Sequence, residues 1–151
     1  MKKFLFFFVF LMSVWALNAQ TLIISEVADP QDDYDARFVE LYNATNSTID
    51  FSTETYYLYR YANGNTSGAS VQLTGSVAPG ETFVIAYSQS AFNSAYGFDP
   101  DQVSGIIQGN GDDVYALYQG GDESTGTLLD IYGEIGVDGT DTDWIMKIVV
   151  Q

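Results

Sequence analysis

The fold is decided by the stretch RFVELYN at residues 37–43. Its aliphatic residues Val39 and Leu41 fall on one side of an extended chain and its charged Glu40 on the other, which is the two-residue period of a β-strand. The stretch YYLYRY at residues 56–61 alternates in the same way and places three tyrosines on one side. Either side of this second strand is apolar enough to be buried.

Short segments of this kind recur from Thr21 onward between clusters of Gly, Asn, Asp and Ser, and none of them holds a helical period. They predict nine strands, at residues 22–28, 37–43, 48–51, 56–61, 70–74, 82–87, 104–108, 113–118 and 127–132. The chain is therefore predicted to be all-β, a β-sandwich of about eight to nine short strands in one domain.

The connections carry recognisable turn chemistry. Pro79-Gly80 suits a type II turn, and residues 120–126 suit a hairpin loop between the last two strands. Residues 90–96 are the exception, because one or two helical turns capped by Ser88 or Ser90 are expected there. This helix is a short decoration of the sandwich.

The first twenty residues have the pattern of a secretory signal peptide. Lys2 and Lys3 precede an apolar run that ends before the polar boundary at residues 18–20. The run is shorter than the roughly 20 residues that a membrane span needs. We therefore expect residues 1–20 to be removed by cleavage between Asn18 and Thr21. Residues 21–151 are then a secreted, cell-surface or periplasmic domain with no membrane span.

The residue types that the sequence lacks exclude several kinds of chemistry. The chain contains no His and no Cys, so it has no zinc site of the usual kind, no Ser-His-Asp triad, no cysteine nucleophile and no disulfide. Its 20 acidic and 5 basic residues give a net charge of −15. Nucleic-acid binding needs Lys and Arg to neutralise phosphates, so no nucleic-acid partner is expected.

Four of the acidic residues lie in one predicted loop, between the first two strands. They are Asp29, Asp32, Asp33 and Asp35, and their mutual repulsion favours a bound cation. Calcium takes oxygen ligands, so these four are the candidate metal ligands and calcium the candidate cofactor. The loop lacks the Gly and the closing Glu of an EF-hand, and the alternative is that the charges only keep the domain soluble.

Three further patterns admit a chemical and a structural interpretation. Glu26 and Glu40 lie on neighbouring predicted strands, either as an acid–base or metal pair or as strand-edge hydrogen-bond partners. The tyrosines of residues 56–61 are either a stacking platform for sugars or a partner protein, or ordinary strand packing. A later acidic group at residues 112–113 and 122–123 is interpreted as turn structure.

The order of several motifs resembles the lamin tail domain family in its bacterial exported form. The matching segments are LIISEV, RFVELYN, IDFS, VAPGETFVI, GNGDDVYALY and DIYG, at residues 22–27, 37–43, 49–52, 77–85, 109–118 and 130–133. The resemblance spans residues 21–144 and implies an immunoglobulin-like β-sandwich. It also implies a non-catalytic module, found alone or beside secreted hydrolases, whose animal relatives contact proteins and DNA. A likeness of fold does not by itself transfer function.

Two functions follow from these patterns. The first is a secreted, non-enzymatic binding or structural module that contacts protein or glycan and is stabilised by calcium if the acidic loop binds it. The alternative is an accessory or truncated domain of a secreted metal-dependent hydrolase or nuclease, with Glu26, Glu40 or a loop Asp as general acid and base. The first is favoured because the carboxylates are assigned to separate loops and strand ends rather than to one concave site. The apolar residues 145–150 either form a closing strand or belong to a longer chain.

Overall fold

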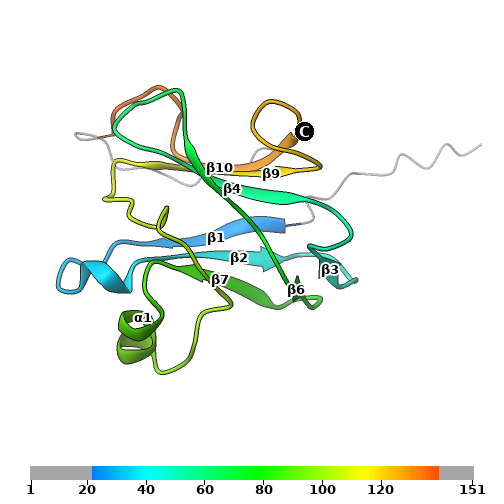
Figure 1. Cartoon of the computed structure of the whole chain (residues 1–151), viewed down its shortest axis with the longest axis horizontal. Coiled ribbons are helices and arrows are strands. Elements are labelled where there is room, and N and C mark those ends of the chain that lie inside the picture. The colour runs from blue at the N-terminus through cyan, green and yellow to red at the C-terminus, as the bar shows by residue number, and fades with distance from the viewer. Residues whose placement is uncertain (1–21, 140–151) are drawn as a thin grey trace, which may run out of the picture.

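The structure is a computed structural model that describes residues 22–139 (Figure 1). Two four-stranded sheets, of order β1-β2-β7-β8 and β10-β9-β4-β5, face each other, and a small sheet pairs β3 with β6. The strands are β1 (Leu22–Ala28), β2 (Phe38–Asn43), β3 (Ile49–Asp50), β4 (Tyr56–Tyr61), β5 (Ala69–Gln72), β6 (Ser76–Val77), β7 (Thr82–Ala86), β8 (Gln102–Val103), β9 (Val114–Gln119) and β10 (Thr127–Tyr132).

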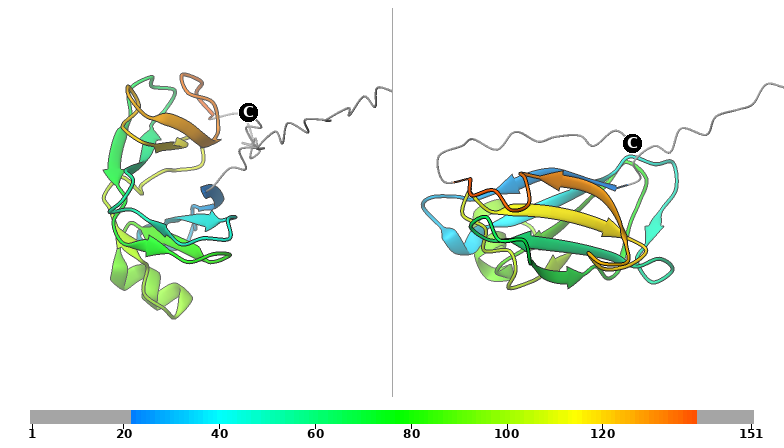
Figure 2. Two further views of the ribbon diagram at one scale, coloured as in Figure 1. Left: turned by 90° about the vertical axis from the view of Figure 1, so that its right-hand side faces the viewer. Right: turned by 90° about the horizontal axis from the view of Figure 1, so that it is seen from above.

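The layers and the pairing are those of an immunoglobulin-like β-sandwich. Figure 2 shows the two sheets as separate layers when the molecule is seen from the side. Neighbouring strands run antiparallel, except β7 and β8, which run parallel. The predicted fold class is therefore confirmed. The predicted signal peptide and the expected closing strand both lie outside the described residues.

The core between the two sheets follows from the alternation along the strands. Val39 and Leu41 of β2 pack against Leu58 of β4 and Leu117 of β9, and all four are fully buried. Phe51 links the sheets at one end through edge-to-face contacts with Phe83 and Tyr56, whose ring centroids lie 5.1 and 5.4 Å from its own. Burial of such aliphatic and aromatic side chains contributes most of the favourable free energy of folding.

The outer faces of both sheets also carry buried residues. On the second sheet, Tyr59, Tyr61 and Tyr118 pack with Val114 and Ala116, and each is less than a tenth exposed. The predicted partition of residues 56–61 between two faces is thus confirmed, with both faces buried. A third cluster, on the outer face of the first sheet, consists of Phe38, Val84, Ala86 and Phe92.

Phe92 belongs to the helix α1 (Gln89–Tyr96), which covers this part of the first sheet. The oxygen of the Ser88 side chain accepts the N–H of Ala91, so Ser88 is the N-cap. The helix ends at Gly97, whose φ of 84° lets its N–H donate to the carbonyl of Asn93. The predicted helical decoration and one of its two predicted caps are confirmed.

Each seam between the sheets is bridged by one polar side chain. On one side, the Asp130 carboxylate of β10 accepts the N–H of Ile24 in β1 at 2.8 Å and that of Ile131 at 2.9 Å. Burial raises the pKa of Asp130. On the other side, the Gln102 amide accepts the N–H of Thr74 at 3.0 Å and donates to the carbonyl of Gln72 at 2.9 Å. These side chains satisfy backbone groups that edge strands leave open.

Eight of the nine predicted strands occur, and β1, β4 and β10 have the predicted bounds. The strand predicted at residues 104–108 is wrong. The strand ends at Val103, and the chain then turns, with the N–H of Ile107 donating to the carbonyl of Ser104 at 3.2 Å. Ile107 is nevertheless buried in the core. Its apolar side chain suggested a strand, but it reaches the core from a turn.

The described residues also include three short elements that the sequence did not predict. They are β6, β8 and the 3-10 turn η1 (Tyr34–Ala36). No helix in this part of the chain has both the length and the apolar character to cross a membrane.

Candidate functional site

The acidic loop between β1 and β2 uses two of its carboxylates for local structure. Asp29 Oδ1 lies 2.6 Å from Nε of Arg37, in a half-buried ion pair. Asp33 accepts the N–H of Asp35 at 3.2 Å and so caps η1. Within residues 22–139, no three acidic side chains form a group that could hold a metal ion. Calcium binding by Asp29, Asp32, Asp33 and Asp35 therefore requires the loop to rearrange, and it stays a prediction.

Glu26 and Glu40 are direct neighbours across β1 and β2. A bulge at Ser25 sets this register, and the Ser25 hydroxyl donates to Glu40 Oε1 at 2.6 Å. Glu26 is exposed and Glu40 half-buried, and neither lines either of the two cavities described below. Carboxylates on an open sheet surface lack the enclosed pocket in which an acid–base pair works.

The later acidic residues hold turns and side chains in place. Asp122 accepts hydrogen bonds from Ser124 and Thr125 in the β9–β10 loop, and those bonds to Ser124 and Thr125 lower the pKa of Asp122. Glu123 accepts a hydrogen bond from the Tyr61 hydroxyl at 2.7 Å. Asp113 forms an ion pair with Arg60. Their interpretation as structural groups is supported by these contacts.

The tyrosines of β4 do not form an open platform. Tyr56, Tyr59 and Tyr61 are buried, and Tyr57 is half-buried. The Tyr61 hydroxyl lies 3.2 Å from that of Tyr118, and burial is the main cause that raises the pKa of Tyr61 well above its ordinary value. These rings serve packing, so the stacking-platform interpretation of this run is not supported.

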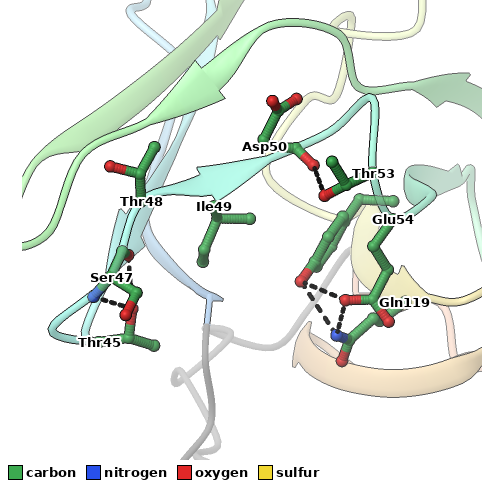
Figure 3. A pocket seen from close by; sticks show the side chains of 9 residues that line it. Thr45, Ser47, Thr48, Ile49, Asp50, Thr53, Glu54 and Gln119 are labelled. Carbon is green, nitrogen blue, oxygen red and sulfur yellow. Dashed lines mark hydrogen bonds between the residues drawn. The ribbon is translucent and has the colours of Figure 1, made fainter.

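An open cavity of about 350 Å³ lies where β3 approaches the ends of β4 and β9 (Figure 3). Its lining residues are Thr45, Ser47, Thr48, Ile49, Asp50, Thr53, Glu54, Tyr56 and Gln119. The Gln119 amide donates to Glu54 Oε2 at 2.7 Å and to the Tyr56 hydroxyl at 3.0 Å. Figure 3 shows this polar group on one side of the cavity, opposite the loop with Thr45 and Ser47. A second, shallower cavity lies beside Ser88, Asn93 and Asp99 at α1.

Three exposed aromatic residues gather at the end of the sandwich that carries η1 and α1. Tyr34, Tyr96 and Phe98 are 54%, 40% and 53% exposed, and we call them the aromatic face. Figure 1 shows η1, in light blue, and α1 at the same end of the molecule, and the two elements are in contact. The side chains of Asp32 and Asp33 are near enough to Tyr96 to help raise its pKa, although burial is the larger cause. The acidic loop therefore borders the aromatic face.

Sequence reasoning missed the aromatic face. The sequence pattern places Tyr34 only in an acidic loop and residues 90–96 only in a short helical decoration. The available signal was the crowding of Phe92, Tyr96 and Phe98 around one short helix, which is more aromatic surface than a helix of eight residues can bury.

The fold described above is that of an immunoglobulin-like domain. Comparison with protein families assigns it further. The family model described as Lamin Tail Domain matches residues 16–136, which is most of the chain. The protein belongs to the lamin tail domain family, a family of non-catalytic immunoglobulin-like domains. A search of curated proteins finds no match.

Proposed function

We propose that this protein is a secreted, non-enzymatic binding module that contacts a protein or a glycan outside the cytoplasm. The observation that carries the proposal is the aromatic face. Soluble domains rarely expose several large aromatic side chains together unless the surface is used for contact.

The absence of an enzymatic role is supported by how the acidic side chains are used. Among residues 22–139, Asp29, Asp113, Asp122 and Asp130 each accept hydrogen bonds from an arginine or from backbone N–H groups. Glu26 and Glu40 meet on an open sheet surface. General acid–base catalysis needs two such groups to converge on a bound substrate, and Glu26 and Glu40 line neither of the two cavities described above.

The two partner classes correspond to two places on the domain. A protein partner fits the aromatic face, because Tyr and Phe are favoured at protein interfaces. A glycan partner fits the cavity of Figure 3, where carboxylate, amide and hydroxyl groups lie beside the apolar side chain of Ile49.

Secretion is tested first, by expressing the full chain in a bacterial host and sequencing the N-terminus of the exported product. The expected product begins between residues 19 and 21. Recovery of an intact N-terminus from the cytoplasm would contradict secretion.

The binding role is tested on the exported protein with immobilised oligosaccharides and with peptides of different charge. Binding that is weakened by Tyr96→Ser with Phe98→Ser, or by Glu54→Ala with Gln119→Ala, is the expected result. In parallel, the protein is assayed with glycoside and phosphodiester substrates in the presence of calcium or magnesium. Hydrolysis that disappears in Glu26→Gln with Glu40→Gln would overturn the non-enzymatic role in favour of a metal-dependent hydrolase.

A further inference from the structure

The aromatic face is built on a rigid support. Phe92, which is buried, lies beneath the two rings at the end of α1, with ring centroids 4.7 Å from that of Tyr96 and 5.1 Å from that of Phe98. Tyr96 also meets the buried ring of Phe38 edge-on at 5.2 Å. Rings held in this way lose little conformational entropy when a partner binds, so their exposed sides are ready for contact.

The surroundings of these rings are acidic. Glu26, Asp32, Asp33 and Asp35 are exposed near Tyr34 and Tyr96, and Asp99 directly follows Phe98. Within residues 22–139, the one basic side chain in this region is Arg37, which is engaged by Asp29, and Arg60 is paired with Asp113. These described residues therefore give the aromatic face a negative potential, which attracts cationic partners and repels anionic ones.

The domain already contains one example of the contact that such a surface offers. The guanidinium of Arg37 lies 4.9 Å from the centroid of the Tyr34 ring, within the range of a cation–π interaction. Arg stacks on aromatic faces better than Lys, because its guanidinium is planar and more weakly hydrated. Tyr96 and Phe98 also expose aromatic ring surface.

We infer that the aromatic face of Tyr34, Tyr96 and Phe98, bordered by the acidic β1–β2 loop, is a docking surface for an arginine-rich segment of another protein. Arginine side chains stack on the Tyr96 and Phe98 rings, and the carboxylates of Glu26, Asp32 and Asp33 balance their charge. This inference rests on the proposed binding function and names the partner chemistry at one of its two surfaces.

The test uses the exported protein and a fluorescent octapeptide of alternating Arg and Ser, with an equally charged Lys–Ser peptide for comparison. Binding is followed by fluorescence anisotropy. The Arg peptide is expected to bind several times more tightly than the Lys peptide, since stacking adds to charge only for Arg. Raising NaCl from about 0.1 M to about 1 M, which shortens the Debye length from about 10 Å to about 3 Å, is expected to weaken binding but to preserve the preference for Arg.

Two variants with matched controls locate the site. Tyr96→Ser with Phe98→Ser is expected to weaken binding about tenfold or more, as loss of aromatic hot spots does. Val137→Ser, which removes an exposed apolar residue that is not part of the aromatic face, is expected to leave binding unchanged. Tyr96→Phe keeps the ring and is expected to keep the affinity. Melting curves of all variants confirm that each is folded.

A second pair tests the charge. Glu26→Gln with Asp32→Asn is expected to weaken binding several-fold, whereas Glu81→Gln with Asp122→Asn removes two charges outside the aromatic face and its acidic border and is expected to have little effect. Equal weakening by both pairs, or equal affinity for the Arg and Lys peptides, would show unspecific charge attraction and overturn the inference.

The outcomes also separate this inference from the proposed function. Binding of neutral oligosaccharides but not of the Arg peptide would overturn the docking surface for arginine and leave the binding function intact. Hydrolytic activity that depends on Glu26 and Glu40 would overturn the proposed function, whatever the peptides do.

Discussion

Replacing Asp113 by Ala is expected to destabilise the domain by about 3 kcal/mol, because the change breaks a buried ion pair from one side. Asp113 Oδ2 lies 2.9 Å from Arg60 Nη1, and the Asp113 side chain is only 1% exposed. Its other oxygen accepts the N–H of Asn63 at 3.0 Å. The change thus removes the counter-charge of a guanidinium and the acceptor of a backbone N–H in one step.

The magnitude follows from the surroundings of the pair. Removing one partner of a buried ion pair costs about 3 to 5 kcal/mol. The Arg60 side chain is 20% exposed, so water reaches part of the guanidinium, and the lower end of that range applies. The buried Nε of Arg60 has no hydrogen-bond partner among residues 22–139, so the freed guanidinium is poorly placed to find another acceptor in this part of the domain.

The assay is urea unfolding of the full chain, followed by circular dichroism, together with a thermal melt. A loss of about 3 kcal/mol lowers the midpoint by roughly 10 °C in a domain of this size. Asp113→Asn, which keeps an acceptor for Asn63 but removes the charge, is expected to lose less. The double variant Arg60→Met with Asp113→Leu is expected to be more stable than Asp113→Ala, because it leaves no unpaired charge. Two results would refute this reasoning: an Asp113→Ala variant whose free energy of unfolding lies within about 1 kcal/mol of the wild type, or a double variant that is less stable than Asp113→Ala.

Three further predictions concern other parts of the domain. Burial raises the pKa of Asp130, so the stability that its protonated carboxyl contributes is fully present below the ordinary pKa of 3.8 and is lost as pH rises through the native pKa. Urea unfolding at several pH values should therefore show Asp130→Asn becoming more stable relative to the wild type as pH rises. The opposite trend would mean that the N–H groups that donate to Asp130 outweigh its burial. Gly97→Ala is expected to lower the free energy of unfolding by about 1 kcal/mol, because Gly97 has a φ of 84°. Gly105 is the control: both glycines have open space where a Cβ would lie, but Gly105 has no positive φ, so Gly105→Ala is expected to leave stability unchanged in the same urea assay. If the acidic loop binds calcium, a calcium concentration of about a hundred times the dissociation constant adds about 2.7 kcal/mol to the free energy of unfolding. The melting midpoint of the wild type should then be higher in calcium than in chelator, whereas that of Asp32→Asn with Asp33→Asn should not change. Equal midpoints for the wild type would contradict calcium binding.

The sequence was most informative where local chemistry and burial agree. The alternation in residues 37–43 and 56–61 correctly predicted two central strands, and in residues 37–43 also the core-facing side, because a strand buried on one face must repeat its apolar residues every second position. The helix at residues 89–96 was predictable from a Ser cap, which acts within one turn. The fold class and the family resemblance rest on many such local signals in the right order.

The sequence was misleading where an apolar residue reaches the core from irregular backbone. Ile107 is buried from a turn, and the two-residue strands β6 and β8 are too short to show a period. Their positions depend on which strands lie beside them, and such pairing is a long-range property that no local pattern encodes.

The sequence by itself determined that this protein is an all-β, acidic domain without histidine or cysteine, and that its carboxylates are its main reactive groups. Only the tertiary structure decided what those carboxylates do: Asp29 and Asp113 are paired with the two arginines of the described chain, and Asp130 joins the two sheets. The tertiary structure also decided which aromatic residues are buried and which are left at the surface. Tyr59 and Tyr61 are covered, whereas Tyr96 and Phe98 are not. The physical reason is that composition sets how much charge and apolar surface a chain carries, but packing between distant segments sets which part of it water can reach.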